Sequence, residues 1–139
     1  MISFHYQNDF THIDARNYRR WLCEVASVEN NVIRKLDYIF CSDDYLLEIN
    51  QQFLDHDTYT DIITFDYSSE GMLEGEIYIS TDRVKDNAAV FDVDESDELR
   101  RVIVHGLLHL MGYGDKTLHE KNLMREKESE MMQMFHVKQ

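Results

Sequence analysis

The chain has 139 residues and a formal net charge of −13, with 43% apolar and 29% charged residues. This length and composition predict one soluble domain with one core, and they argue against a disordered chain or a membrane protein. The negative charge also argues against a simple nucleic-acid binder, because phosphate backbones attract basic surfaces. Residues 16–20 and 34–35 are nevertheless locally basic.

Nine elements are predicted along the chain from apolar spacing and turn residues. Strands, rich in apolar and aromatic residues, are expected at residues 2–7, 36–42, 60–67 and 75–80. Helices, with apolar residues at helical spacing, are expected at residues 12–29, 42–54, 81–91, 94–112 and 116–135. Ser42 is a good N-terminal cap for the second of these helices.

The order of these elements predicts a single α+β (α/β-like) domain over residues 1–139. The strand–helix–strand units at the start imply some parallel pairing. The loop at residues 68–74 suits an antiparallel, hairpin-like connection. We therefore expect a mixed sheet of about four strands with about five helices packed on it, and a metal-binding helix in the C-terminal third.

The N-terminal segment and the cysteines indicate which cellular compartment to expect for the protein. MISFHYQNDF has neither a basic start nor a long apolar run, so we expect no signal peptide. Cys23 and Cys41 are isolated and lack C-x-x-C spacing. Two lone cysteines fit a reducing cytoplasm, so we expect buried thiols without a disulfide in a cytoplasmic protein.

The segment HGLLHLMGYGDKTLHE, residues 105–120, is the candidate metal site. His105 and His109 are four residues apart, so on a helix both rings face the same side. The surrounding residues are apolar, and buried imidazoles need partners, which a metal supplies. Gly112 is expected to end the helix and turn the chain back, so that a third ligand beyond it and a water complete a catalytic zinc site. The alternative is a helix with two hydrogen-bonded core histidines.

The residue after the first histidine limits the classes of metal-dependent hydrolase that this segment fits. In zinc peptidases the helix reads H-E-x-x-H, and the glutamate is the general base. This position is Gly106 here. The sequence therefore argues against a peptidase, while another hydrolase class, such as an esterase, stays open.

HGLLHLMGYGD resembles the signature His-Gly-x-Leu-His-Leu-x-Gly-Tyr-Asp-His of the YbeY family, the bacterial endoribonucleases and rRNA maturation factors. INQQFLDHDTYTDIITFDY is similar to the family's Asn-x-x-aromatic segment, which leads into Thr-Asp-Val-Leu-Ser-Phe. GEIYIS resembles its Gly-Asp-Ile-x-Ile-Ser strand. These matches span residues 49–115 in the same order as in the family.

The resemblance implies a mixed sheet with helices and one bound zinc ion per chain, although other divalent metals fit such sites. It implies cleavage of single-stranded RNA, in maturation of the 3′ end of small-subunit rRNA and in ribosome quality control. The implied partners are single-stranded RNA or rRNA and the small ribosomal subunit or its assembly factors. The alternative, from another class, is a ribosome-assembly binding factor whose metal is mainly structural.

Carried over by position, His105 and His109 match the family's first two metal ligands. The family's third histidine falls on Asp115 and its aspartate falls on Gly114, so the metal and catalytic residues implied here are the two histidines and Asp115. An aspartate binds zinc, but its negative charge should make the metal a weaker Lewis acid. His119, ten residues past His109, is the alternative third ligand.

The family's arginine, expected to hold a phosphate, falls on Leu54. The phosphate contact is therefore missing or comes from elsewhere, and the candidates are Arg100, Arg101, Lys116 and Lys121. Thr60 and Asp61, before the third strand, are expected to line the cleft and contact substrate. Candidates for stacking on the bases of single-stranded RNA are Tyr59, Tyr67 and Tyr113, of which Tyr113 lies nearest the histidines in sequence.

Overall fold

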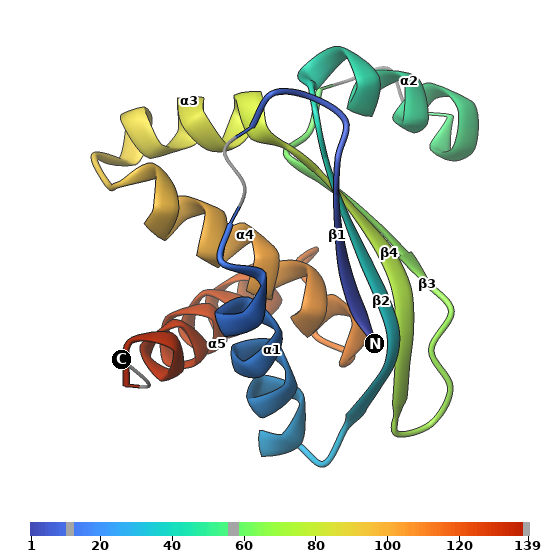
Figure 1. Cartoon of the computed structure of the whole chain (residues 1–139), viewed down its shortest axis with the longest axis vertical. Coiled ribbons are helices and arrows are strands. Elements are labelled where there is room, and N and C mark those ends of the chain that lie inside the picture. The colour runs from blue at the N-terminus through green and yellow to red at the C-terminus, as the bar shows by residue number, and fades with distance from the viewer. Residues whose placement is uncertain (11–12, 56–58, 138–139) are drawn as a thin grey trace.

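A mixed sheet organises the computed structural model, which describes residues 1–10, 13–55 and 59–137 (Figure 1). The described strands are β1 Ile2–Tyr6, β2 Val32–Cys41, β3 Ile62–Asp66 and β4 Met72–Ser80. The described helices are α1 Ala15–Val28, α2 Asp43–Leu54, α3 Thr81–Phe91, α4 Glu95–Leu110 and α5 Leu118–Val137. Residue 12, where the first helix was expected to start, lies outside the described residues, as do residues 56–58 of the stretch that resembles the family.

The sheet has the order β1-β2-β4-β3, with β1 parallel to β2, β2 parallel to β4, and β3 antiparallel to β4. This confirms the predicted mixed sheet and places β3 at an edge. Both central strands begin earlier than expected, and the pairing of Val32 with Met72 shows why. Backbone hydrogen bonds to a neighbouring strand extend β2 and β4 through residues of mixed burial, such as the exposed Val32 and the buried Leu73, which do not give a continuous apolar run.

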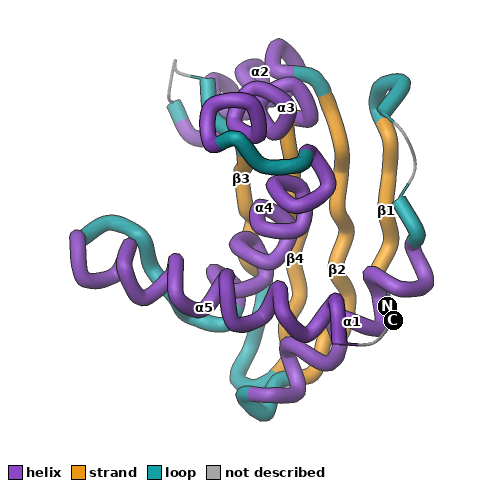
Figure 2. The backbone as a smooth tube through the Cα atoms, turned by 90° about the vertical axis from the view of Figure 1, so that its left-hand side faces the viewer, coloured by secondary structure: helices purple, strands orange, loops and turns teal. Residues whose placement is uncertain are grey.

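The helices that carry the candidate site cover one face of the sheet (Figures 1 and 2). Helix α4 lies over β3 and β4, α1 packs on β2, and α5 packs on α4 and α1. The hydroxyl of Tyr38 on β2 donates to the carbonyl of Ile103 on α4 at 2.8 Å, which ties the helix to the sheet inside the core. Helix α2 packs on β3 and β4 with a smaller cluster of its own, formed by Cys41, Leu46, Ile49 and Ile63.

The two cysteines are free thiols. Cys41 is buried as expected, whereas the expectation of a buried thiol is wrong for Cys23, which is exposed on the outer side of α1. Its neighbours Trp21 and Leu22 take the inward positions of that helix. Within the described residues, no helix combines the length and the apolar character that crossing a bilayer requires.

Helix α4 approaches the sheet most closely at Gly106. A Cβ atom there would lie 2.9 Å from Cδ1 and 3.0 Å from Cγ2 of Ile77, and 3.1 Å from Cδ1 of Ile62. The glutamate of a zinc-peptidase helix therefore has no room at this position. The close contact also sets the depth at which the neighbouring turns of α4 lie beside the edge strand β3.

We expect the variant Gly106→Glu to lower the free energy of unfolding by at least about 3 kcal/mol, because it forces a carboxylate against Ile77 and overpacks the interface. Denaturant unfolding measures this. Ser96→Glu, at an exposed position on the first turn of the same helix, should stay within about 0.5 kcal/mol of the wild type. Equal stability of the Gly106→Glu variant and the wild type would show that α4 does not need this contact.

Candidate metal centre

The chain turns sharply where α4 ends. The N–H of Gly112 donates to the carbonyl of His109 at 3.0 Å, and the N–H of Tyr113 donates to the carbonyl of Leu108 at 3.0 Å. These are the two bonds of a Schellman motif, and Gly112 has the positive φ of 106° that such a motif needs. The turn predicted at Gly112 is confirmed, and it brings the following loop back beside the helix.

The start of α5 fixes the other end of this loop. Thr117 accepts the N–H of Glu120 at 3.1 Å, and Glu120 Oε1 accepts the N–H groups of Thr117 at 3.1 Å and of Lys116 at 3.0 Å. This reciprocal pattern is a capping box. A Cβ atom on Gly114 would lie 3.0 Å from the Glu120 carboxyl group. An aspartate at this position, as in the family, would therefore require the Glu120 side chain to shift by a few tenths of an ångström. The loop is held at both ends around Asp115.

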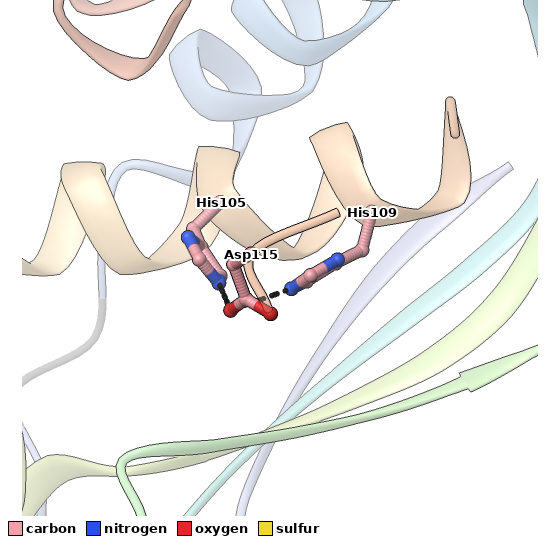
Figure 3. A group of neighbouring side chains, drawn as sticks. All are labelled: His105, His109 and Asp115. Atoms are coloured by element: carbon pink, nitrogen blue, oxygen red, sulfur yellow. Dashed lines mark ion pairs between the residues drawn. The ribbon is translucent and has the colours of Figure 1, made fainter. Parts of the chain in front are cut away.

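Three donor atoms meet between α4 and this loop (Figure 3). Oδ2 of Asp115 lies 3.4 Å from Nε2 of His105 and 3.4 Å from Nε2 of His109. Two ligands bound at about 2.0–2.2 Å to one tetrahedral ion are about 3.3–3.6 Å apart, so these separations suit zinc. Of the described His, Cys, Asp and Glu residues, these three form the group whose donor atoms all lie within 4.8 Å of one another.

The far nitrogen of each ring is held by an oxygen acceptor. Nδ1 of His105 lies 2.6 Å from Oε2 of Glu128, and Nδ1 of His109 lies 2.9 Å from the carbonyl oxygen of Tyr113. A carboxylate and a carbonyl only accept, so each Nδ1 carries the proton and each Nε2 keeps its lone pair for a metal. Metal-binding histidines in proteins are oriented in this way. With the Nδ1 atoms bonded in this way, both Nε2 atoms are directed at Asp115.

Charges around the histidines favour a cation. Burial would raise the pKa of Glu128, which is only 4% exposed, but hydrogen bonds from His105 and Arg101 hold that pKa below its usual value. Burial lowers the pKa of His105, but the hydrogen bond and charge of Glu128 and the charge of Asp115 raise it more. Burial also raises the pKa of Asp61, whose charge interacts with that of His105. Asp115 thus lies beside both Nε2 atoms, and Glu128 and Asp61 add negative charge near His105.

The alternative third ligand lies elsewhere. His119 is exposed in the first turn of α5, and it is not part of the group of donor atoms. Asp115 is the residue that the structure places between the two rings.

The donor atoms face a cleft of about 1030 Å³ between the edge strand β3 and helices α4 and α5. Thr60 and Asp61 line this cleft, as expected for residues that contact substrate, and the hydroxyl of Thr60 donates to the carbonyl of Ile62 at 3.3 Å. Leu54, at the position of the family's arginine, lines the cleft as well.

The basic candidates divide into two groups. The lining residues are Arg101, Lys116 and Lys121, together with Arg125, which was not among the candidates. Arg100 does not line the cleft. Its Nη2 lies 2.6 Å from Oδ1 of Asp97, and its guanidinium lies 4.7 Å from the ring centroid of Phe135. Arg100 therefore stabilises the far side of α4 and is no candidate for the phosphate contact.

The three tyrosines that were candidates for base stacking do not line the cleft. The ring of Tyr113 packs against the core, and its hydroxyl donates to Glu29 at 2.5 Å, where burial and this bond raise the pKa of Tyr113 to about 12. It does not line the cleft, so its contribution to the site is the carbonyl that orients His109. Tyr59 and Tyr67 are exposed, but they lie outside the cleft lining too. The Schellman turn accounts for the position of the Tyr113 ring. It places the backbone carbonyl of Tyr113 beside His109, while the ring packs against the core.

Glu128 was missed because it lies 23 residues beyond His105 in an acidic, polar stretch. One signal was available. Met124, Glu128 and Met131 follow one another at helical spacing, and all three are buried. An acidic residue in line with buried methionines requires a partner inside the protein, since an unpaired buried carboxylate is very unfavourable.

Comparison with known proteins identifies relatives of this chain. The family model described as Endoribonuclease YbeY matches residues 3–136. A protein named Endoribonuclease YbeY from Flavobacterium psychrophilum is 50% identical over 139 residues, which cover 100% of this chain and 99% of that protein. One of the same name from Cytophaga hutchinsonii is 60% identical over 111 residues, covering 79% of this chain and 78% of that protein.

A solved structure has the same fold. The solution structure of a Thermotoga maritima protein matches with a TM-score of 0.72 and 28% sequence identity, covering 99% of this chain and 91% of that one. The family model and the relatives cover this chain over nearly its whole length, including the histidine helix and the loop that follows it. The chain therefore belongs to the YbeY family.

Proposed function

We propose that this protein is a metal-dependent endoribonuclease that cleaves single-stranded RNA. The observation that carries the proposal is the set of three donor atoms, from His105, His109 and Asp115, that opens on the cleft of about 1030 Å³. Membership of a family whose curated relatives are named Endoribonuclease YbeY supports the choice of RNA as substrate.

We propose zinc as the metal, with one ion per chain. The donor set suits zinc, because it consists of two imidazole nitrogens and one carboxylate oxygen. A hydrogen bond at Nδ1 orients each imidazole. Other divalent metals bind the same donors. When bound, such an ion supplies a Lewis acid that lowers the pKa of water and polarises a phosphoryl oxygen.

The chain's own residues then have distinct tasks. Glu128 and the Tyr113 carbonyl hold the protons on the Nδ1 atoms, so that both Nε2 atoms stay available as ligands. Gly106 provides no base, and we assign proton transfer to Asp61, because it lines the cleft and burial raises its pKa. Its carboxylate can accept a proton from an attacking water or from the substrate's 2′-hydroxyl.

The substrate's phosphates need cationic contacts that Leu54 does not provide. Lys116 and Lys121 line the cleft, and neither forms an ion pair with any residue that the structure describes. Arg101 also lines it but is bound to Glu128 at 2.8 Å. We therefore assign the phosphate contacts first to the two lysines, at the side of the cleft formed by α5 and the loop before it.

The cleft favours catalysis over a purely structural metal. Structural zinc sites are closed by four protein ligands, whereas catalytic sites use three and leave one position for water or substrate. Among the described residues three donors gather, and they do so at a cleft. This observation weighs against a ribosome-assembly factor whose metal only supports the fold.

The biological setting that we propose follows the family resemblance. The substrate is rRNA of the small ribosomal subunit, near its 3′ end, and the protein acts in rRNA maturation and ribosome quality control in the cytoplasm. The small subunit or its assembly factors are the proposed partners. The net charge of −13 fits a protein that binds RNA at a local site rather than over its whole surface.

Zinc-loaded protein should cleave a single-stranded RNA, and both a chelator and the variant His109→Ala should abolish cleavage, because each removes the metal. A gel assay with a labelled RNA measures cleavage, and elemental analysis measures bound zinc. Equal cleavage by the metal-free protein would end the catalytic proposal. Zinc that stays bound without any cleavage would support the assembly-factor alternative.

The third ligand can be tested by zinc affinity alone. Asp115→Ala should weaken zinc binding by more than the about 10- to 100-fold that is typical for loss of a group outside the ligand set, because it removes a donor atom. His119→Ala is the matched control and should bind zinc like the wild type. The opposite ranking in a competition titration with a chromogenic chelator would reject Asp115 as the ligand.

Glu128→Gln should lower zinc affinity about 10- to 100-fold, because the amide keeps the size of the side chain but removes the negative charge that raises the basicity of the His105 ring as a ligand. The same titration measures this without any RNA. Glu126→Gln, at an exposed position on the same helix, serves as the control. If the Glu128→Gln variant binds zinc as tightly as the wild type, the carboxylate has no part in orienting the ring.

A further inference from the structure

An exposed aromatic ring lies in the cleft at the turn between α3 and α4. Phe91 is 52% exposed, and it lines both the main cleft and an adjoining one of about 590 Å³. The two clefts share the lining residues Phe91, Glu98, Arg101 and Arg125, so they adjoin at Phe91, and the main cleft is the groove that also holds the donor atoms. A half-exposed phenylalanine that lines a groove has no evident task in the core of the protein.

A cation accompanies this ring. The guanidinium carbon of Arg125 lies 5.8 Å from the ring centroid of Phe91, and the Arg125 side chain is 60% exposed. Its Nη1 also lies 3.7 Å from Oε1 of Glu128, the residue that holds His105. The aromatic ring and the metal centre are thus linked through two side chains of α5.

The spacing along α4 gives the length of the part of the groove between Glu98 and the metal centre. Glu98, which shares the groove with Phe91, lies seven residues before His105 on the same helix, which is about 10 Å at 1.5 Å per residue. Stacked nucleotides of one strand rise about 3.4 Å each, so this span corresponds to about three nucleotides. A single strand with a phosphate at the metal centre therefore reaches Phe91 without leaving the groove.

The charges on the two walls of the cleft favour one path for a bound single strand of RNA. The wall formed by β3 and the residues before it contributes Asp61 and Asp66, whereas the wall formed by α5 contributes Lys121 and Arg125, four residues apart on one face of the helix. Phosphates are attracted to the second wall and repelled by the first. The bases can then face Phe91, while the backbone follows α5.

We propose that Phe91 and Arg125 form a nucleobase subsite, in which a base of single-stranded RNA a few nucleotides from the metal centre stacks on the Phe91 ring and Arg125 contacts the adjoining phosphate. The inference rests on the proposed function, because it needs single-stranded RNA in the cleft. Its support is the pairing of an exposed π face with a cation in a groove continuous with the metal centre.

The test measures binding rather than cleavage. The probe is a short fluorescein-labelled 2′-O-methyl oligonucleotide, checked on a gel for integrity, and its affinity for zinc-loaded full-length protein is read by fluorescence anisotropy. Phe91→Ala and Phe91→Leu should both weaken binding about 5- to 100-fold, the range that loss of one aromatic stacking platform produces. Phe91→Trp should bind as tightly as the wild type, and its indole fluorescence should be quenched by the probe.

Two controls separate stacking from general damage. Val90→Ala changes a neighbouring side chain that is 77% exposed but lies outside both clefts, and it should bind like the wild type. An abasic strand of the same length should bind wild type and Phe91→Ala equally, because it offers no base to stack. Arg125→Gln should reduce the salt dependence of binding by about one phosphate contact.

The subsite is rejected if Phe91→Ala and Phe91→Leu bind the probe as tightly as the wild type, or if Phe91→Ala weakens the probe and the abasic strand equally. RNA cleavage by the wild type is measured alongside. Cleavage with no effect of the Phe91 variants overturns the subsite and leaves the proposed function standing. A wild type that neither binds nor cleaves RNA overturns both.

Discussion

Two hydrogen bonds behind the imidazole rings determine what this protein can do. The bonds from His105 to Glu128 and from His109 to the Tyr113 carbonyl place both protons on the Nδ1 atoms, so both Nε2 atoms face Asp115 with free lone pairs. Without them the rings could take either tautomer and turn away from a common ion. Each bond comes from a different segment, so α5 and the loop before it must both be in place for the site to exist.

The rest of the fold holds these segments in place. Contact of Gly106 with the sheet sets the depth of α4, the Schellman turn at Gly112 sends the chain back, and the capping box of Glu120 fixes the loop from the other side. The same close contact excludes a glutamate base beside His105, which separates this protein from zinc peptidases. An acidic chain can act on RNA in this arrangement, because acidic groups attract the metal cation and the lysines of one wall attract phosphate.

Local patterns predicted the parts of the site that lie close together in sequence. The spacing of His105 and His109 and the glycine at 112 were enough to place one face and one turn, because helical periodicity and positive φ are local properties. Asp115 came from positional match with the family. Glu128 was missed, because its contact with His105 depends on how α5 packs across α4, and no local pattern encodes that packing. The packing of the Tyr113 ring against the core was missed for the same reason.

Diffraction from zinc-soaked crystals at the zinc absorption edge tests the central claim most directly. The account predicts one anomalous peak about 2.0–2.2 Å from the Nε2 atoms of His105 and His109 and from a carboxylate oxygen of Asp115. A peak coordinated by His119 in place of Asp115, or rings turned so that the Nδ1 atoms bind the ion, would contradict it.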